Sequence, residues 1–470
     1  MAMVDTDTDT GTGTTVSTAS APAAKRAALV AAMLGFAVVT LDAQVTNVAL
    51  PAIRGSLGGS LSDLQWIVSG YTLMFSALLL FGGTVADRVG SRSAYRWGMV
   101  LFVLASVACG FAPSLPVLII ARLVQGVGAA VVTPTSLSLI REAFDEAGER
   151  AHAIGMWAVG GSVAAAAGPI VGGLLAAVNW RIIFFLNVPV GAGALIALRF
   201  VTPSPRRRVR FDVPGQVTAI IGLAALTFAC IEGGSIGFAE PSVIGGFILA
   251  AVSLTACVWV QARSAHPMVP LTLFRSRSMS VALGVAFISM AGFYGLVFLQ
   301  SLYFQQYRGS SALMAGLLFL PMTGITAITN SQVAKISARF GHVFPVVLGL
   351  VGMGIGLVGI VLLPGTAPVW VVAALMAVVG VGGGFTVPPI AALILEVAPQ
   401  HLAGTASGVL NMFRQLGGSL GVAVFGSIVN ASAGFLVGLR VDFFVITVLV
   451  AVTAIAAVVV LRHAGQQSAS

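Results

Sequence analysis

The chain alternates long apolar segments with short polar connections along almost its whole length. Fourteen apolar runs have lengths near the roughly 20 residues that a helix needs to cross a bilayer. They cover residues 27–53, 64–86, 95–112, 115–140, 151–177, 182–202, 213–232, 242–262, 279–303, 311–332, 343–363, 368–394, 402–429 and 441–461. A helix satisfies its own backbone hydrogen bonds within lipid. The pattern therefore predicts an all-α integral membrane protein with 14 spans.

Composition supports this prediction. The chain is 58% hydrophobic and 8% charged, whereas a soluble domain carries about 25% charged residues. Its net charge of +9 resides in the short connections, so we expect no nucleic-acid partner. The three cysteines, Cys109, Cys230 and Cys257, stand inside apolar runs without metal or disulfide spacing. We expect no metal site.

The basic residues also predict the orientation in the membrane. With a cytoplasmic N-terminus, 18 of the 24 Lys and Arg residues lie on the cytoplasmic side. Only Arg54, Arg181, Arg308 and Arg440 then lie outside. Because cytoplasmic connections carry an excess of Lys and Arg, both termini are predicted to be cytoplasmic. Residues 1–24 are rich in Thr, Ser, Ala and Gly, which is typical of a disordered tail and not of a signal peptide.

Two of the runs resemble each other and predict an internal duplication. Gly126 precedes Pro134 by eight residues in the fourth run, and Gly380 precedes Pro388 by eight in the twelfth, at an offset of 254. Both runs then lead to an acidic residue. Two six-helix halves with a substrate site between them suit secondary transport. The predicted parts are a disordered cytoplasmic tail (1–26), an N-terminal bundle (27–202), a two-helix insert with basic linkers (203–278), a C-terminal bundle (279–462) and a cytoplasmic tail (463–470).

Two charges stand where a membrane helix should have none. Asp42 lies about 16 Å, and Arg122 about 10 Å, from the outer ends of their runs. A charge at the centre of a membrane helix costs about 2.5–3.5 kcal/mol on insertion scales, which favours a functional interpretation. Their similar depth allows a direct or water-bridged pair. We predict that they form the proton-handling centre of a transporter; a structural helix–helix contact is the alternative.

The connection between the second and third runs resembles the cytoplasmic loop motif of the major facilitator superfamily. The segment 83–92 contains a Gly, three residues, Asp-Arg, one residue, a Gly, one residue and an Arg. The resemblance implies a latch that holds one conformation. Its residues would be Gly83, Asp87, Arg88, Gly90 and Arg92, together with Glu142. The matching second-half loop, 335–341, lacks the Asp, so an asymmetric latch is expected.

Two further motifs resemble those of the same superfamily. Residues 121–130 match the fourth-helix motif, whose Arg, here Arg122, is implicated in proton transfer. The fifth run resembles the motif that marks antiporters, although Ala164 stands where the family usually has Gly. The residues of this motif are Gly155, Gly168, Pro169, Gly172 and Gly173. Pro and Gly at these positions predict a bendable, closely packed helix.

Three more stretches narrow the resemblance to one subgroup. Residues 179–191, 212–215 and 411–418 are similar to segments of the 14-span drug:proton antiporters of the EmrB/QacA and methylenomycin-resistance type. The resemblance implies a major facilitator fold of two six-helix bundles plus two extra helices that are central in the sequence. It also implies proton-driven export.

Candidate substrate contacts are less sharply defined. Arg414 lies about 18 Å from the cytoplasmic end of its run, and structural and functional interpretations of it are balanced. Glu232 ends the seventh run, where a solvated helix end is the alternative. Aromatic and Met residues could line a lipophilic pocket or simply pack. The full set is Gln125, Arg414, Phe36, Tyr71, Met74, Phe75, Trp157, Phe293, Tyr294, Phe385 and Glu232. The tenth run has no acid, which puts dicationic substrates in doubt.

The predicted function is proton-driven export of lipophilic drugs or antibiotics across a bacterial cytoplasmic membrane. A dedicated exporter of one endogenous metabolite or antibiotic has the same motifs and stays open as an alternative. An importer is disfavoured by the Gly-Pro pair of the fifth run. We expect no enzyme activity, because the five His residues stand at helix ends, loops or the tail without a nucleophile–base pattern. No P-loop is present, so we expect a proton gradient and not ATP to drive transport. We also expect no cofactor and a monomeric protein.

Overall fold

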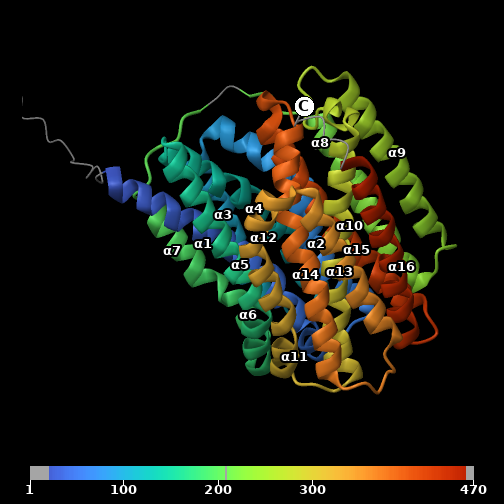
Figure 1. The fold of residues 1–470 in the computed structure, drawn as a ribbon. Coiled ribbons are helices and arrows are strands. Elements are labelled where there is room, and N and C mark those ends of the chain that lie inside the picture. Colours follow the sequence, from blue (N-terminus) through green and yellow to red (C-terminus); the bar gives the residue numbers. More distant parts are fainter. Residues whose placement is uncertain (1–20, 207–208, 462–470) are drawn as a thin grey trace, which may run out of the picture.

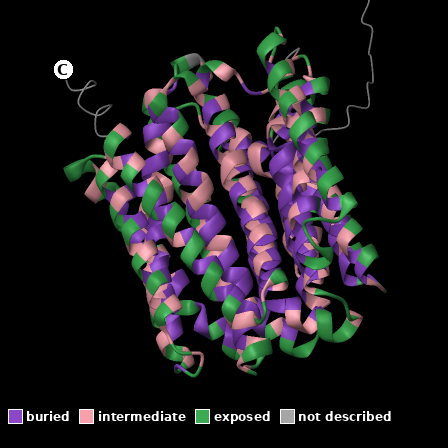
Figure 2. Ribbon diagram, turned by 90° about the vertical axis from the view of Figure 1, so that its right-hand side faces the viewer, coloured by how far each residue is buried: buried purple, intermediate pink, exposed green. Residues whose placement is uncertain are grey.

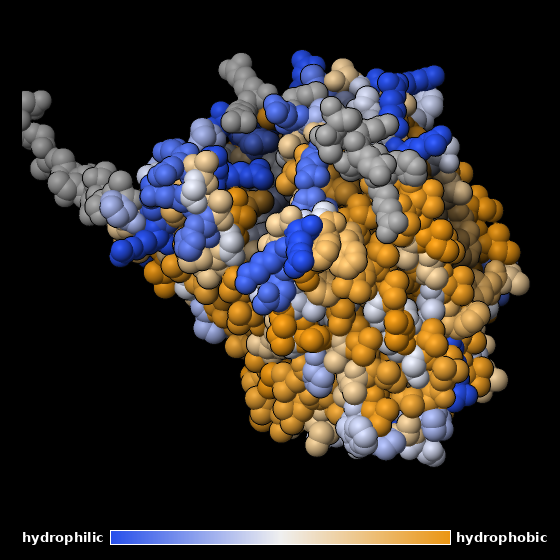
Figure 3. Space-filling view, viewed as in Figure 1, coloured by the Kyte–Doolittle hydropathy of each residue, from blue (hydrophilic) through white to orange (hydrophobic). Residues whose placement is uncertain are grey.

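The computed structural model describes residues 21–206 and 209–461, which form a bundle of helices (Figure 1). The predicted C-terminal tail, residues 463–470, and most of the predicted N-terminal tail lie outside the described residues. Exposed apolar side chains cover the outer faces of the helices, and buried residues follow their inner faces (Figure 2). Apolar residues surround the middle of the molecule, and hydrophilic residues gather at the top (Figure 3). This distribution fits a protein surrounded by lipid.

Each predicted run lies on a helix. In the described residues, thirteen helices are long and apolar enough to cross a membrane. The long helices are α1 (Ala21–Leu57), α2 (Leu61–Val89), α3 (Ser91–Gly110), α4 (Leu115–Ala143), α5 (Ala147–Val178), α8 (Val213–Ile236), α9 (Pro241–Arg263), α10 (Arg277–Leu302), α12 (Leu320–Phe340), α13 (Val343–Leu362), α14 (Val369–Val397), α15 (Ala403–Ala431) and α16 (Phe435–Ala456). The run 182–202 is the shorter apolar helix Ile182–Leu198, which is about 26 Å long. It comprises α6 (Ile182–Phe185) and α7 (Asn187–Leu198).

Short helical segments complete the connections. α11 (Ala312–Leu318) leads directly into α12. The others are η1 (Leu271–Arg275), η2 (Tyr303–Tyr307), η3 (Gln400–Leu402) and η4 (Ala457–Leu461). Local sequence explains several helix ends. Ser60 and Asp63 form a capping box at the start of α2. Gly90 ends α2 with φ +88°, a conformation that glycine adopts without steric cost.

The helices pack as two bundles that repeat one pattern. In the first bundle, α1 contacts α4, α5 and α7, while α4 also contacts α2 and α3. In the second, α10 contacts α14, α15 and α16, while α14 also contacts α12 and α13. α4 and α14 both have 29 residues and begin 254 positions apart. The matched contacts show that the fold is two six-helix bundles; the domain boundaries themselves stay a prediction.

The repeated Gly and Pro pattern has a physical basis in these contacts. A Cβ atom on Gly126 would come within 2.4 Å of the carbonyl oxygen of Tyr71 in α2. A Cβ atom on Gly380 would come within 2.4 Å of the carbonyl oxygen of Met322 in α12. Both glycines therefore permit the same close helix approach, once in each half.

The two-helix insert is central in the sequence but lies at the side of the molecule (Figure 1). α8 packs against α9, and it contacts α2 of one bundle and α15 of the other. Asp212 organises its start by accepting hydrogen bonds from Gly215 N, Gln261 Nε2 and Met268 N. The acid of the 212–215 motif therefore joins α8, α9 and the connection that follows.

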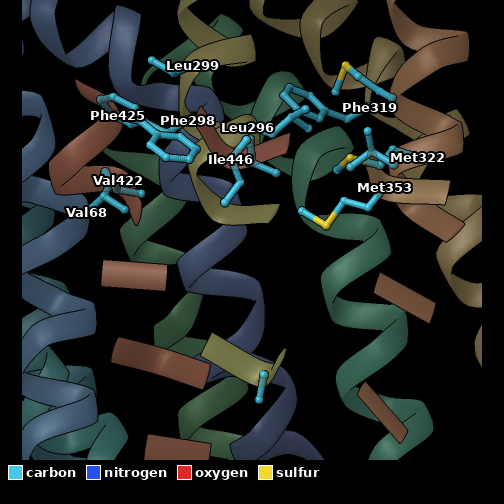
Figure 4. Close-up of a cluster of buried hydrophobic side chains, with 14 of the residues drawn as sticks. Val68, Leu296, Phe298, Leu299, Phe319, Met322, Met353, Val422, Phe425 and Ile446 are labelled. Carbon is cyan, nitrogen blue, oxygen red and sulfur yellow. The ribbon is translucent and has the colours of Figure 1, made fainter. Parts of the chain in front are cut away.

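The two bundles are joined mainly at one end. We call the end with the α2–α3, α4–α5 and α14–α15 connections the basic end, and the other the opposite end. One hydrophobic cluster joins both bundles, including Val68 of α2 with Val422 and Phe425 of α15 (Figure 4). A second cluster has all its buried members in the N-terminal bundle and the residues just after α7.

Hydrogen bonds close the seam toward the opposite end. Gln65 of α2 donates to the Val422 and Ala423 carbonyls at 3.1 and 2.7 Å. Ser69 and Ser419 each donate to the other's carbonyl oxygen at 3.2 Å. Ser301 Oγ also donates to the Asn47 carbonyl, between α10 and α1, at 2.7 Å.

At the basic end, the surface is hollowed between the polar helix ends of the N-terminal bundle and the centre of the molecule (Figure 3). The molecule is thus closed at the opposite end and open at the basic end.

Candidate functional site

Asp42 and Arg122 form an ion pair inside the N-terminal bundle. Arg122 Nη1 lies 2.5 Å from Asp42 Oδ2. Asp42 is 3% exposed and Arg122 is fully buried. α1 supplies the acid and α4 supplies the base, so the direct pair that their similar depth allowed is present. A charge-assisted bond between buried groups is stronger than a neutral one.

Two buried amides complete the coordination of the carboxylate. Gln125 Nε2 donates to Asp42 Oδ1 at 2.9 Å, and Asn187 Nδ2 donates to the same oxygen at 2.7 Å. Gln125 lies one turn after Arg122 on α4, and its Oε1 accepts from Arg122 Nη1 at 2.7 Å. Asn187 stands at the start of α7 and also donates to Ser106 Oγ of α3 at 2.8 Å. Four helices therefore fix the position of one carboxylate.

The guanidinium of Arg122 is held on its other sides by α2 and two aromatic rings. Its Nε donates to the Ile67 carbonyl at 3.1 Å. It lies 4.2 Å from the ring centroid of Tyr71 and 5.8 Å from that of Phe184, distances typical of cation–π contacts. Tyr71 is fixed in turn, because its hydroxyl donates to the Val39 carbonyl at 3.2 Å.

This charged network belongs to one half only. The positions of α14 that match Arg122 and Gln125 at the offset of 254 are Met376 and Val379, both fully buried. The duplication therefore preserves the helix packing but not the charges.

Removal of one partner from a buried ion pair costs about 3–5 kcal/mol, because the other charge is left uncompensated.

Sequence reasoning did not single out three polar residues that the structure places inside the bundles. Asn187 entered only as part of a subgroup motif, although it is a polar residue inside an apolar run, which is the available signal. Ser106 carries no such signal, since Ser is common in membrane helices. Asp442 stands at the start of the run 441–461, but α16 begins at Phe435 and buries it about 10 Å from the helix end.

The predicted latch does not form a network in this structure. Asp87 and Arg88 are exposed, and Asp87 has no hydrogen bond or ion pair within the described part of the chain. Glu142 accepts from Ser91 Oγ at 2.6 Å, while Arg92 donates to the carbonyls of Leu198 and Arg199. The predicted latch residues are therefore not joined to one another in this conformation, because Glu142 and Arg92 bond instead to Ser91 and to the Leu198 and Arg199 carbonyls. The latch stays a prediction.

The glycines of the fifth-run motif pack α5 against two helices. A Cβ atom on Gly168 or Gly172 would collide with Gln44 or Val45 of α1. Gly173 of α5 lies against the carbonyl oxygen of Ala312 in α11. In return, Gly316 of α11 lies against the carbonyl oxygen of Pro169 in α5. The close packing predicted for these glycines is therefore present in the structure, in a seam shared by both bundles.

Gly155 departs from this pattern. It has no atom of another residue within 4 Å of its Cβ position. It takes no part in the close packing, because it lies near the open basic end of α5.

Several predicted substrate contacts have other roles. Gln125 and Tyr71 belong to the buried Asp42 network, and Phe75 is 4% exposed beside Tyr71. These three residues have almost no free surface in this structure. Glu232 accepts from the Trp66 indole at 3.1 Å and so joins α8 to α2. The assignment of these four residues to a substrate surface stays a prediction.

The remaining candidates are partly exposed residues of both bundles. Phe36 of α1 stacks on Trp157 of α5 with ring centroids 4.0 Å apart. Phe293 and Tyr294 are neighbours on α10, with ring centroids 5.9 Å apart, and the Tyr294 ring lies against Gly418 of α15. The last members of this partly exposed set are Met74 and Phe385.

The fold and this site define a two-bundle secondary transporter, and the comparisons agree. The model of the Major Facilitator Superfamily matches residues 32–422. The chain therefore belongs to the Major Facilitator Superfamily. The fold is similar to that of the partially occluded inward open xylose transporter XylE from E. coli, with a TM-score of 0.64, 16% identity, and coverage of 92% of this chain and 96% of that one.

Curated relatives make the likeness more specific. The chain is 37% identical over 414 residues to the methylenomycin A resistance protein of Streptomyces coelicolor, covering 88% of this chain and 87% of that protein. It is 37% identical over 406 residues to the multidrug resistance protein Stp of Mycobacterium tuberculosis, covering 86% of this chain and 75% of that protein.

Proposed function

We propose that this chain is a proton-driven antiporter that exports lipophilic drugs or antibiotics from the cytoplasm or inner leaflet. The observation that carries the proposal is the buried Asp42–Arg122 pair in a two-bundle transporter. The names of its relatives, which refer to methylenomycin A resistance and multidrug resistance, support the substrate class. The proton gradient would be the energy source, with no cofactor and no catalytic chemistry.

The basic end would face the cytoplasm of a bacterial cell membrane. It carries most of the Lys and Arg residues of the connections, as cytoplasmic connections do. In this orientation the structure is open to the inside. The intact Asp42–Arg122 pair would then represent the state after proton release inward. We propose that the chain acts as a monomer.

Protonation of Asp42 from outside would weaken its attraction to Arg122 and favour the inward-open state. Substrate would enter from the cytoplasmic side, and proton release would reset the cycle. The coupling would arise because the proton has different affinities for the two states. One charge moving through 100 mV contributes about 2.3 kcal/mol per cycle.

The test is drug-induced proton release in everted vesicles, with methylenomycin A and a panel of lipophilic drugs. We expect Asp42→Asn to abolish drug-induced proton release while drug binding is retained, since Asn cannot bind and release a proton. Asp442→Asn is the matched control: it removes another buried carboxylate, whose two oxygens have no hydrogen-bond partner in the described residues. It should retain coupled transport. Undiminished coupling in Asp42→Asn would contradict the assignment.

A dedicated exporter of one endogenous metabolite or antibiotic is the second candidate. The likeness to a methylenomycin A resistance protein favours it as much as broad export. A resistance profile restricted to one compound class would select this alternative, and a broad profile would select the first.

A further inference from the structure

Arg414 is a deeply placed cation without an ionic partner. It lies 11 residues into α15, about 17 Å from the basic end. In the described residues it makes no ion pair. Its one hydrogen bond joins Nη1 to Asn411 Oδ1 at 3.2 Å, on its own helix, and its buried Nε has no acceptor. Arg414 as a whole is partly exposed, but a buried polar atom without a hydrogen-bond partner is costly, so the unpaired Nε calls for an explanation.

No acidic side chain is placed to neutralise it. Among residues 21–206 and 209–461, only two acids are buried, Asp42 and Asp442. Asp42 is already bound by Arg122 and two amides. Asp442 lies near the opposite end of α16, several turns from the depth of Arg414. The interior around Arg414 therefore carries a net positive charge.

Arg414 lies where the closed part of the seam ends. Ser419, five residues further along α15, forms the reciprocal hydrogen bonds with Ser69. Residues 417–419 are buried, whereas 411–416 are partly exposed. Along the α15 axis, Arg414 thus lies about 8 Å from Ser419, on the side toward the basic end. A compound entering from the basic end would meet it at the limit of its path.

Aromatic rings lie near Arg414. The ring of Tyr294 lies against Gly418, one turn beyond Arg414. Phe293 packs edge-on against Tyr294, with ring centroids 5.9 Å apart. A ligand at Arg414 would therefore lie beside aromatic surface.

We propose that Arg414 binds a negatively charged group of the exported compound, such as a carboxylate, so that this transporter selects lipophilic weak acids over lipophilic cations. The proposal rests on the export function above and specifies its substrate class. A planar guanidinium forms bidentate hydrogen bonds with a carboxylate, and the free Nε–H provides one of the two donors. The rings of Phe293 and Tyr294 would contact the lipophilic part.

The experiment compares two dyes of one scaffold and opposite charge. Fluorescein is an anionic xanthene at neutral pH, and rhodamine 123 is a cationic xanthene of similar size. The full chain is reconstituted in liposomes with an imposed proton gradient, and uptake of each dye is measured. We expect the wild type to prefer fluorescein. Arg414→Gln should lower kcat/KM for fluorescein by about tenfold or more and leave the value for rhodamine 123 within about twofold.

Two further variants separate ligand binding from a structural role. Arg414→Lys keeps the charge without the bidentate geometry and should retain part of the fluorescein activity. Arg414→Glu should reverse the preference toward rhodamine 123. Arg440→Gln is the matched control, because it removes an exposed Arg at the other end of the molecule. Size-exclusion chromatography and thermal unfolding would check that each variant folds.

Proton-driven transport of rhodamine 123 but not fluorescein would overturn the inference and leave the export function standing. An equal loss for both dyes in Arg414→Gln, with normal folding, would also overturn it. If the proton gradient drives transport of neither dye, the proposed export of such compounds is refuted. Anion binding at Arg414 is then tested separately, by fluorescence anisotropy of fluorescein with wild type and Arg414→Gln. Equal affinities of the two proteins for fluorescein would refute the proposed anion site.

Discussion

At the scale of single residues, the site is a carboxylate held by three donors from two other helices. Arg122 and Gln125 come from α4, and Asn187 comes from α7. The position of the carboxylate therefore depends on the amides as well as on the arginine. The similar depth of the two charges along their runs was visible in the sequence, whereas the contribution of Asn187 required the fold.

Asn187→Ala should weaken proton coupling without abolishing it. The change removes one of two amide donors and leaves the Asp42–Arg122 pair intact. We expect proton-driven export to fall about tenfold, the effect of losing a hydrogen bond to a charged group. Transport at varied external pH would measure it. Asn179→Ala is the control, because Asn179 is exposed and only accepts from Arg181 N. Equal activity of Asn187→Ala and wild type would show that Gln125 suffices.

At the scale of helices, α5 and α11 close the opposite end through glycines. Gly173 and Gly316 each lie against the other helix's backbone, so the two helices approach as closely as their main chains allow. Such contacts have no tolerance for an added methyl group. The same helix α5 packs against α1 just beyond Asp42, at Gln44 and Val45. The seam and the proton site are therefore adjacent along α1.

Gly316→Val should disfavour closure of the opposite end. Its Cβ atom would come within 2.4 Å of the Pro169 carbonyl oxygen, and overpacking of this kind costs about 1–3 kcal/mol. In a cysteine-free background with Ser69→Cys as reporter, an impermeant maleimide added outside should label the variant faster than its parent. Export should fall several-fold. Gly324→Ala is the control, since nothing lies within 4 Å of its Cβ position. Unchanged labelling of Gly316→Val would contradict this role of the seam.

At the scale of the whole molecule, two bundles with matched internal packing are joined mainly toward the opposite end. The charges are confined to different parts of the two bundles: the ion pair belongs to the first, and the unpaired Arg414 belongs to the second. A cycle of alternating access requires the closed end to open as the open end closes. The contact between Ser69 and Ser419 lies on that seam, and Ser69 stands between Ile67 and Tyr71, the two α2 residues that contact the Arg122 guanidinium.

A disulfide across the seam should stop transport. Ser69→Cys combined with Ser419→Cys places two thiols where the wild type has reciprocal hydrogen bonds. We expect oxidation to cross-link them and to reduce export to about a tenth of wild type or less, because the opposite end can then no longer open. Reduction should restore export, and each single variant should be insensitive to oxidant. Full activity of the cross-linked form would show that this seam stays closed throughout the cycle.

The sequence by itself determined the number and approximate limits of the apolar runs, the family, and the buried pair of Asp42 and Arg122. These follow from composition, length and local motif, since a charge inside an apolar run is visible without a fold. Only the tertiary structure decided which polar residues meet. It brought Asn187 to Asp42, removed Tyr71 and Gln125 from the surface, separated Asp87 from Glu142, and left Arg414 without a partner. Such contacts join residues far apart in the chain, and their formation depends on helix rotation and on which end of the seam is closed. A periodic pattern in one segment carries no information about either.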